Sequence, residues 1–241
     1  MKNIAFFGGT FDPPHRGHLA MARAAANRFA LDHVLFAPAA VQPVKAGAVQ
    51  ASFVERYAMV CLATQHDPRF VPSLIDTPRF VDGIPRPNYT VETLARLRSG
   101  FAARGAKIHL YVLLGADSWL TIAAWREPEK LLEQSDWIIA GRPGFALDDV
   151  PAALPKPLQG RCAFEHASGE FLLRREEGGP IRIAVMADLN EAVSGTALRN
   201  ARSSGEKIQQ LLPDAVADYI EKRRLYIGWK SVGSGGDEAL V

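Results

Sequence analysis

The sequence has little cysteine and no long hydrophobic run. Its two cysteines, Cys61 and Cys162, lie far apart and fit no metal-binding spacing. An intracellular, reduced chain is therefore expected. No apolar stretch approaches the roughly 20 residues that span a membrane, and the apolar start at residues 1–7 is too short for a signal peptide. Together these absences favour a cytoplasmic protein.

Neither sign of charge is in large excess. The formal net charge is +2 at pH 7, which is too small to indicate nucleic acid or a membrane surface as a partner. We therefore expect neither partner. Of the 241 residues, 48% are hydrophobic and 22% are charged. The chain is long enough to bury a substantial core, and its composition is typical of a globular protein.

Several common motifs for binding phosphate or metal are missing. The sequence contains neither G-x-x-x-x-G-K-[ST] nor G-x-G-x-x-G, which excludes a P-loop and a dinucleotide fingerprint. It also contains neither H-E-x-x-H nor C-x-x-C. His15 and His18 form a conceivable metal pair, but no carboxylate or thiol motif accompanies them. We therefore expect no metal ion held by protein side chains.

Short β-prone runs alternate with longer helical patterns along the chain. The pattern predicts strands at residues 4–7, 34–37, 108–114, 137–140 and 181–186, and helices at 17–29, from 52, from 90 and from 213 to about 225. Ser52 and Glu55 form an S-x-x-E capping box at the second helix. This order predicts an α/β fold with a doubly wound, mainly parallel sheet and helices on both faces. In such sheets ligands bind at the carboxyl ends of the strands.

Domain organisation is expected to be simple. Residues 1–227 are predicted to form one domain. Within it, residues 144–180 are rich in proline, glycine and charge, which indicates an insertion or a long loop. Residues 228–241 have little to pack against and are predicted to be a flexible tail.

The most informative segment joins the first predicted strand to the first helix. It reads G-G-T-F-D-P-P-H-R-G-H over residues 8–18. Gly8 and Gly9 let the backbone turn tightly and approach a ligand closely. His18 falls in the first turn of the helix, where free N–H groups and the macrodipole favour an anion, and His15 precedes it by three residues. A lone histidine would more simply be a cap or a surface residue, but this arrangement favours phosphate binding.

This segment resembles the signature of the nicotinate-nucleotide adenylyltransferase family, within the wider H-x-G-H nucleotidyltransferase superfamily. Four further segments resemble motifs of that family, in the family's order, and the matches extend over residues 4 to about 227. They are Pro87–Thr90 (P-S-Y-T in the family), Leu114–Asp117 (G-x-D) with Trp125 after it, Gly141–Gly144 (R-P-G) and Ser194–Arg199 (S-S-T-x-I-R). The resemblance implies a Rossmann-like nucleotidyltransferase fold. It also implies transfer of AMP from ATP to nicotinate mononucleotide, giving deamido-NAD and pyrophosphate in NAD biosynthesis.

The resemblance also implies which residues bind ATP. Because the acceptor's 5′-phosphate attacks the α-phosphorus directly, catalysis needs positioning and charge stabilisation more than a protein nucleophile. The expected catalytic residues are His15, His18, Lys45 and Arg199, although Lys45 fits a solvated loop lysine equally well. Mg²⁺ should accompany ATP, held by phosphates and water. The expected ATP-binding residues are Gly8, Gly9, Thr10, Phe11, His15, His18, Arg142, Ser194, Thr196 and Arg199.

A second set of residues is implied for the acceptor. Asp117 is expected to bind ribose hydroxyls, and Trp125 to offer a flat face to the nicotinate ring. The helix start at Tyr89 and Thr90 is expected to meet the ring's carboxylate. The full set is Thr10, Tyr89, Thr90, Gly115, Asp117 and Trp125.

Three departures from the family pattern leave alternatives open. Residues 76–87 and 145–182 look longer than usual, and Gly195 stands where the family has a serine. The first of these segments leads into the acceptor pocket. The same chemistry on nicotinamide mononucleotide or another phosphorylated acceptor is therefore one alternative. A non-catalytic nucleotide-binding protein is another.

Overall fold

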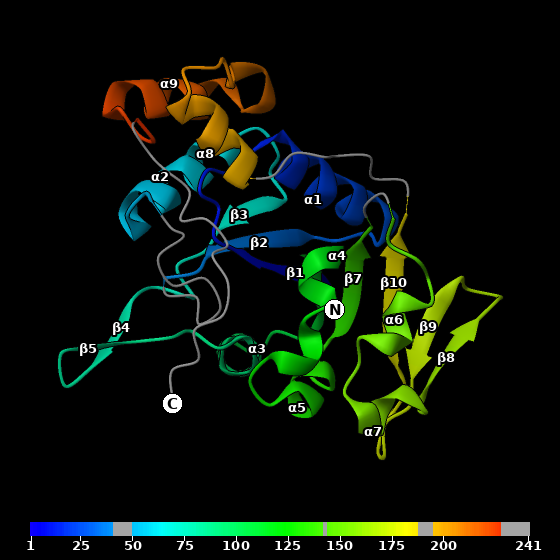
Figure 1. Ribbon diagram of the computed structural model, residues 1–241. Coiled ribbons are helices and arrows are strands. Elements are labelled where there is room, and N and C mark those ends of the chain that lie inside the picture. Colours follow the sequence, from blue (N-terminus) through cyan, green and yellow to red (C-terminus); the bar gives the residue numbers. More distant parts are fainter. Residues whose placement is uncertain (41–49, 142–143, 188–194, 228–241) are drawn as a thin grey trace, which may run out of the picture.

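An eight-stranded sheet forms the centre of the protein, in a computed structural model that describes residues 1–40, 50–141, 144–187 and 195–227 (Figure 1). The strand order is β3-β2-β1-β6-β7-β10-β9-β8. Pairings from β3 through β10 are parallel, whereas β10 with β9 and β9 with β8 pair antiparallel. The strands are β1 (Lys2–Gly9), β2 (His33–Pro38), β3 (Phe70–Pro72), β6 (Ile108–Gly115), β7 (Asp136–Ala140), β8 (Cys162–Glu165), β9 (Glu170–Leu173) and β10 (Ile181–Met186). The predicted doubly wound, mainly parallel sheet is confirmed.

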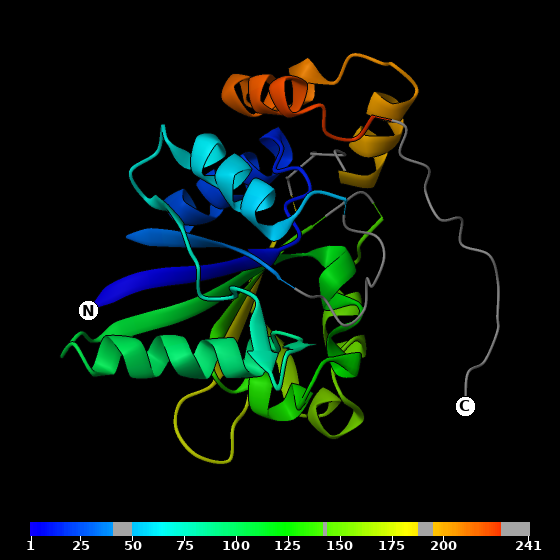
Figure 2. The same cartoon turned by 90° about the vertical axis from the view of Figure 1, so that its left-hand side faces the viewer.

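Helices cover both faces of this sheet. Figure 2 shows α1 and α2 on one face and α3 on the other. None of the helices in the described part of the chain has the length and apolarity of a membrane span. The helices are α1 (Arg16–Arg28), α2 (Phe53–Thr64), α3 (Thr90–Ala102), α4 (Ala116–Trp119), α5 (Pro128–Leu132), α6 (Asp149–Ala152), α7 (Lys156–Gln159), α8 (Gly195–Ser203) and α9 (Asp214–Arg223).

The central strands are buried on both faces because successive side chains point to opposite sides of the sheet. In β1, Ile4 and Phe6 belong to the core cluster that α3 completes. Ala5 and Phe7 belong to the cluster that α1 completes. A strand with two buried faces needs a nearly continuous apolar run. This requirement explains why such runs predicted these strands.

All the predicted strands and helices are present, with ends that differ by at most two residues. Pro213, expected as the first residue of the last helix, is its N-cap instead. Besides β8 and β9, three short strands of the described chain were not predicted: β3 and the two strands of a separate hairpin, β4 (Arg79–Val81) and β5 (Ile84–Arg86). Each has three residues, which is too short for a periodic pattern to develop.

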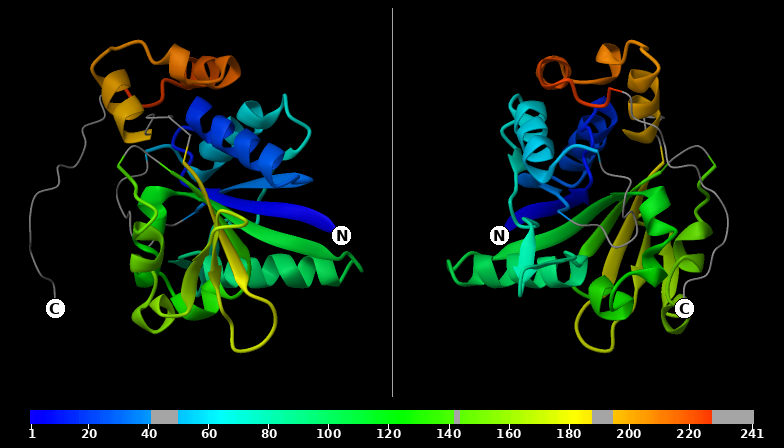
Figure 3. Two further views of the ribbon diagram at one scale, coloured as in Figure 1. Left: turned by 90° about the vertical axis from the view of Figure 1, so that its right-hand side faces the viewer. Right: turned by 60° about the vertical axis from the view of Figure 1, so that its left-hand side comes forward.

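Residues 144–180 are more regular than expected. They contain α6, α7 and the β8–β9 hairpin, which extends the sheet beyond β10 (Figure 3). A long loop is therefore wrong for this segment, because strand pairing with β10 supplies order that local sequence does not indicate. That it is an insertion stays a prediction, as does a single domain over residues 1–227. The predicted tail at 228–241 lies outside the described residues.

The C-terminal helices pack against α2 through a third apolar cluster. Met59 of α2 meets Leu198 of α8 and Val216 of α9 in this cluster, which also contains Tyr226. Figure 1 shows α8 and α9 beside α2, on the same side of the sheet as α1. This packing brings the end of the described chain close to the loop that follows β1.

The predicted capping box at α2 is confirmed. The Glu55 N–H donates to Ser52 Oγ at 3.3 Å, and the Ser52 N–H donates to Glu55 Oε2 at 3.0 Å. Ser52→Ala removes one acceptor, so we expect the free energy of unfolding in urea to fall by about 1 kcal/mol. Ser99→Ala, in the exposed interior of α3, is the control and should cost nothing, because alanine is the better helix former. Equal losses in the two variants would contradict the capping role.

Candidate active site

The order of the strands reverses at β1, which lies between β2 and β6. In doubly wound sheets this switch point is where ligands bind, beyond the carboxyl ends of the strands. Here those ends are Gly9 and Gly115. The loop of residues 10–15 continues from Gly9, and α4 continues from Gly115. This loop is hereafter called the phosphate loop, after the phosphate binding predicted for it. The motif residues on these two segments therefore lie at strand ends, as predicted.

Phe11 anchors the phosphate loop in the core. Its backbone is left-handed, with φ of +49°, and its side chain is 1% exposed. The ring centroid lies 5.3 Å from that of Phe7 and 4.9 Å from that of His18. Because the Phe11 ring is buried, only its backbone can contribute to a ligand cradle. A Cβ at Gly8 would lie 2.8 Å from the Phe6 ring, so any larger residue at the end of β1 would displace that buried ring.

The two histidines lie together at the N-terminus of α1. His15 is the N-cap and is 5% exposed, and the two imidazole centroids are 3.7 Å apart. The His15 backbone N–H donates to His18 Nδ1 at 3.2 Å. A ring nitrogen that accepts a hydrogen bond carries no proton, so neutral His18 holds its proton on Nε2. This hydrogen bond fixes His18 as an Nε2–H donor at a helix end that favours anions.

A buried carboxylate, Asp12, organises the phosphate loop. Its Oδ2 accepts from the Gln50 N–H at 2.8 Å, and its Oδ1 accepts from the Ala51 N–H at 3.2 Å and the Tyr226 hydroxyl at 2.7 Å. Arg199 Nη1 lies 3.9 Å from Oδ2. A buried charge is stable only with such partners. Asp12 therefore ties together segments that are far apart in the sequence.

Arg199 connects α8 to the phosphate loop. Its Nη1 donates to the Asp12 main-chain oxygen at 2.6 Å, and its Nη2 donates to Thr196 Oγ1 at 3.2 Å. A Cβ at Gly195 would lie 3.2 Å from the same Asp12 oxygen. The close approach of α8 to the loop thus leaves little room at this position, where the family motif has a serine. The structure thus brings Thr196 and Arg199 to the loop, as the motif predicted.

Arg56 of α2 supports the phosphate loop from inside the protein. It is 1% exposed, and its Nη1 donates to the Thr10 oxygen at 2.7 Å while Nε donates to the Ala51 oxygen at 3.2 Å. Burial lowers the pKa of Arg56, which the nearby Asp12 charge partly opposes. Sequence analysis missed this residue. A signal was present, because Arg56 occupies the buried face of α2 together with Met59.

The segments expected to hold the acceptor also converge. Tyr89 is the N-cap of α3 and Thr90 its first residue. The Arg126 guanidinium carbon lies 5.3 Å from the Tyr89 ring centroid. Trp125, the neighbour of Arg126, is half-buried, and its Nε1 donates to Thr121 Oγ1 at 3.2 Å. Tyr89 and Trp125 both pack against the main core cluster, and the contact between Arg126 and Tyr89 places the start of α3 beside the Trp125 segment.

The remaining predicted residues divide into two groups. Asp117 is exposed in the first turn of α4, directly after the end of β6. Lys45, Arg142 and Ser194 lie outside the described residues. In the part of the chain that is described, no group of three or more His, Cys, Asp or Glu side chains is arranged to hold a metal ion.

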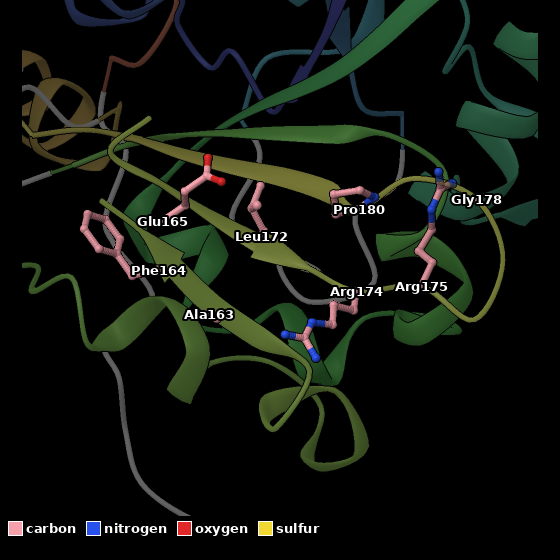
Figure 4. A pocket seen from close by; sticks show the side chains of 8 residues that line it. All are labelled: Ala163, Phe164, Glu165, Leu172, Arg174, Arg175, Gly178 and Pro180. Atoms are coloured by element: carbon pink, nitrogen blue, oxygen red, sulfur yellow. The ribbon is translucent and has the colours of Figure 1, made fainter. Parts of the chain in front are cut away.

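A separate pocket of about 540 Å³ lies on the β8–β9 hairpin (Figure 4). Its lining includes Phe164, Leu172 and Arg174. None of the residues predicted for the active site lines it. The motif residues at the switch point therefore lie apart from this pocket.

Comparison with known proteins identifies the family. Residues 6–201 match the family model described as cytidylyltransferase-like. A relative from Salinispora arenicola, named "Probable nicotinate-nucleotide adenylyltransferase", is 36% identical over 219 residues, which cover 91% of this chain and 98% of the relative. A relative of the same name from Moorella thermoacetica is 35% identical over 224 residues, covering 92% and 91%. The chain belongs to the nicotinate-nucleotide adenylyltransferase family. The resemblance read from the motifs is confirmed.

Solved structures confirm the fold expected of this adenylyltransferase family. Plasmodium falciparum nicotinic acid mononucleotide adenylyltransferase complexed with APC has a TM-score of 0.65 and 18% identity. The match covers 94% of this chain and 98% of that one, and the same enzyme complexed with NaAD matches equally well. The Rossmann-like nucleotidyltransferase fold predicted from the motifs is therefore present.

Proposed function

We propose that this chain moves AMP from ATP to the 5′-phosphate of nicotinate mononucleotide, giving deamido-NAD and pyrophosphate in NAD biosynthesis. The observation that carries the proposal is the H-x-G-H loop, held by buried and partly buried hydrogen bonds at the switch point of the sheet. Its position suits the anionic triphosphate. Relatives that span nearly the whole chain are named for this reaction.

The proposed reaction forms no covalent bond between the protein and its substrates. An oxygen of the acceptor's phosphate forms a bond to the α-phosphorus of ATP, and the bond from that phosphorus to the bridging oxygen breaks. The electron pair leaves with pyrophosphate, and no protein nucleophile takes part. Negative charge builds on the phosphate oxygens in the transition state, so preorganised donors lower the barrier.

The described residues supply such donors. Neutral His18 carries its proton on Nε2 because Nδ1 accepts from the His15 backbone N–H. We assign His15 and His18 to the phosphate oxygens, and the backbone of residues 8–11 to the cradle around them. Arg199 adds a fixed positive charge and holds the loop, and Thr196 accepts from it. Lys45, Arg142 and Ser194 remain predicted contributors.

The acceptor is assigned to the opposite side of the switch point. Gly115 ends β6 and Asp117 lies in the first turn of α4, and both are assigned to the ribose hydroxyls. Trp125 is assigned to the nicotinate ring, and the first amides of α3 after Tyr89 to its carboxylate. Arg126 lies over the Tyr89 ring and puts a positive charge near that helix start. A carboxylate on the ring gains from this charge and a neutral amide does not, which favours the acid form of the acceptor.

Arg126→Gln tests this electrostatic preference. We expect the ratio of kcat/KM for nicotinate mononucleotide over nicotinamide mononucleotide to fall about 2- to 5-fold, because a solvent-exposed charge contributes only modestly. The Arg126 side chain is largely exposed, and its Nε lies 3.8 Å from Glu127 Oε1. Arg104→Gln, an exposed arginine just beyond the other end of α3, makes the same charge change and should leave the ratio unaltered. A ratio unchanged by Arg126→Gln would remove Arg126 from acceptor selection.

Mg²⁺ is proposed to reach the site with ATP. The Asp12 carboxylate, which lies within the phosphate loop, already accepts from three donors. The described residues hold no cluster of metal-ligating side chains. They fit an ion bound mainly by phosphate oxygens and water, whose charge offsets that of the triphosphate. We also propose the cytoplasm as the location, where the free thiols of Cys61 and Cys162 stay reduced.

Product analysis tests the proposed function directly. The chain is incubated with ATP, Mg²⁺ and nicotinate mononucleotide, and the dinucleotide and pyrophosphate are quantified. Adenylyl transfer predicts that both form in equal amounts, with AMP absent. Formation of ADP or AMP in place of the dinucleotide would contradict the proposed bond cleavage. ATP binding without turnover on any phosphorylated acceptor would indicate a non-catalytic nucleotide-binding protein.

A further inference from the structure

We infer that Tyr226 is a positioning residue for the reaction, because its hydroxyl holds the Asp12 carboxylate and with it the phosphate loop. The inference rests on the proposed function for its effect on turnover. Its structural basis is independent of that function. The family model that matches this chain ends at residue 201, so Tyr226 lies beyond the matched segment.

The contact joins the two ends of the described chain. The Tyr226 hydroxyl donates to Asp12 Oδ1 at 2.7 Å across 214 residues of sequence. Both side chains are buried, with 6% and 2% of their surfaces exposed. Burial raises the pKa of Tyr226, and the negative charge of Asp12 raises it further. The hydroxyl therefore stays protonated and remains a donor throughout the physiological pH range.

The phosphate loop is held at several points along its length. Arg56 fixes the Thr10 oxygen, Arg199 fixes the Asp12 oxygen, and Tyr226 fixes the Asp12 carboxylate. The loop then leads to His15, whose backbone N–H sets the orientation of the His18 ring. Loss of one support gives the loop more freedom and displaces the two imidazoles from the phosphates. Small displacements of catalytic groups are costly to turnover.

Packing holds Tyr226 in place for this role. It follows α9 and has a left-handed backbone, with φ of +65°, as does Arg224 at +54°. Left-handed residues other than glycine carry a conformational cost and persist where surrounding contacts fix them. The ring of Tyr226 supplies such contacts in the cluster shared by α2, α8 and α9. The ring of Tyr226 thus packs in the apolar cluster, while its hydroxyl donates to Asp12.

The test is Tyr226→Phe, which keeps the ring in the apolar cluster and removes only the donor. In the free protein, we expect faster amide hydrogen exchange in the peptide covering residues 9–19 and at Gln50 and Ala51. With ATP and nicotinate mononucleotide, kcat should fall about tenfold, as for the loss of one hydrogen bond to a charged group. The KM for nicotinate mononucleotide should change less than kcat, because Thr10 is the one predicted acceptor residue that belongs to the loosened loop.

Tyr219→Phe is the matched control. Tyr219 packs against the same C-terminal cluster, and its substitution should change neither exchange in the loop nor kcat. Asp12→Asn provides a second variant: it weakens the same contact from the other side and should raise exchange in the same peptides. If the two residues act through one contact, Tyr226→Phe should add little to Asp12→Asn.

Two results would overturn the inference. One is unchanged loop exchange and unchanged kcat in Tyr226→Phe, even with a lower melting temperature, since that would leave Tyr226 a purely structural role. The other is an equal response in Tyr219→Phe. A wild-type chain that forms no dinucleotide would instead refute the proposed function, and the exchange data would still decide whether Tyr226 holds the loop.

Discussion

His18→Ala is expected to lower kcat by at least about 10²-fold, the loss that follows removal of a donor to developing charge in a transition state. The Nδ1 of His18 accepts from the His15 N–H, so the proposed donor to the phosphates is the Nε2–H of the neutral ring. Steady-state pyrophosphate release with saturating ATP and nicotinate mononucleotide measures the loss. His66→Ala, at an exposed histidine beside Gln65, should retain wild-type turnover.

The hydrogen bond to His18 Nδ1 also predicts which substitutions at residue 18 retain a donor at the position of Nε2. The amide nitrogen of glutamine can reach the place of Nε2, whereas that of asparagine lies near the place of Nδ1. His18→Gln should therefore retain more turnover than His18→Asn. Equal activities in the two variants would contradict the assignment of the donor to Nε2. A loss of only a few-fold in His18→Ala would remove His18 from the mechanism.

Arg56→Met is expected to cost about 3 kcal/mol of unfolding free energy, because removing one partner leaves buried polar groups uncompensated. The thioether fills much of the space of the arginine stem but donates no hydrogen bonds. The main-chain oxygens of Thr10 and Ala51 each lose a donor, and the Asp12 charge loses a nearby cation. Chemical denaturation with urea measures the change.

Arg223→Met serves as the matched control for Arg56→Met. Arg223 is largely exposed, and its Nη2 pairs with Glu55 at 3.3 Å. Exposed ion pairs contribute at most about 1 kcal/mol, so this variant should remain close to wild type. Similar losses in the two variants would show that burial of Arg56 under the phosphate loop has no special importance for stability.

The sequence predicted those parts of the fold that depend on local pattern. Buried central strands such as β1 and β6 require continuous apolar runs, and the start of α2 requires a capping residue. Both features can be recognised within a few residues of sequence. The β8–β9 hairpin has no such local pattern, since its order comes from the pairing of β9 with β10. The three-residue strands β3, β4 and β5 are too short to show a period.

The same distinction applies to the site. His15, His18 and Arg199 lie in recognisable motifs, and the structure brings them to one loop. The supports of that loop act over long separations: Gln50 is 38 residues from Asp12, and Tyr226 is 214 residues from it. No local pattern encodes such contacts, and tertiary packing alone brings the partners together. Arg56 was the exception, as a charged residue on a buried helix face.

The most direct test of the proposed function is pyrophosphate release with ATP and Mg²⁺, comparing nicotinate mononucleotide with nicotinamide mononucleotide as acceptors. The proposal predicts a large preference in kcat/KM for the acid, whose carboxylate meets the start of α3 near Arg126. Preference for the amide would keep adenylyl transfer but contradict the assigned acceptor. Absence of release with both acceptors would contradict the proposed function itself.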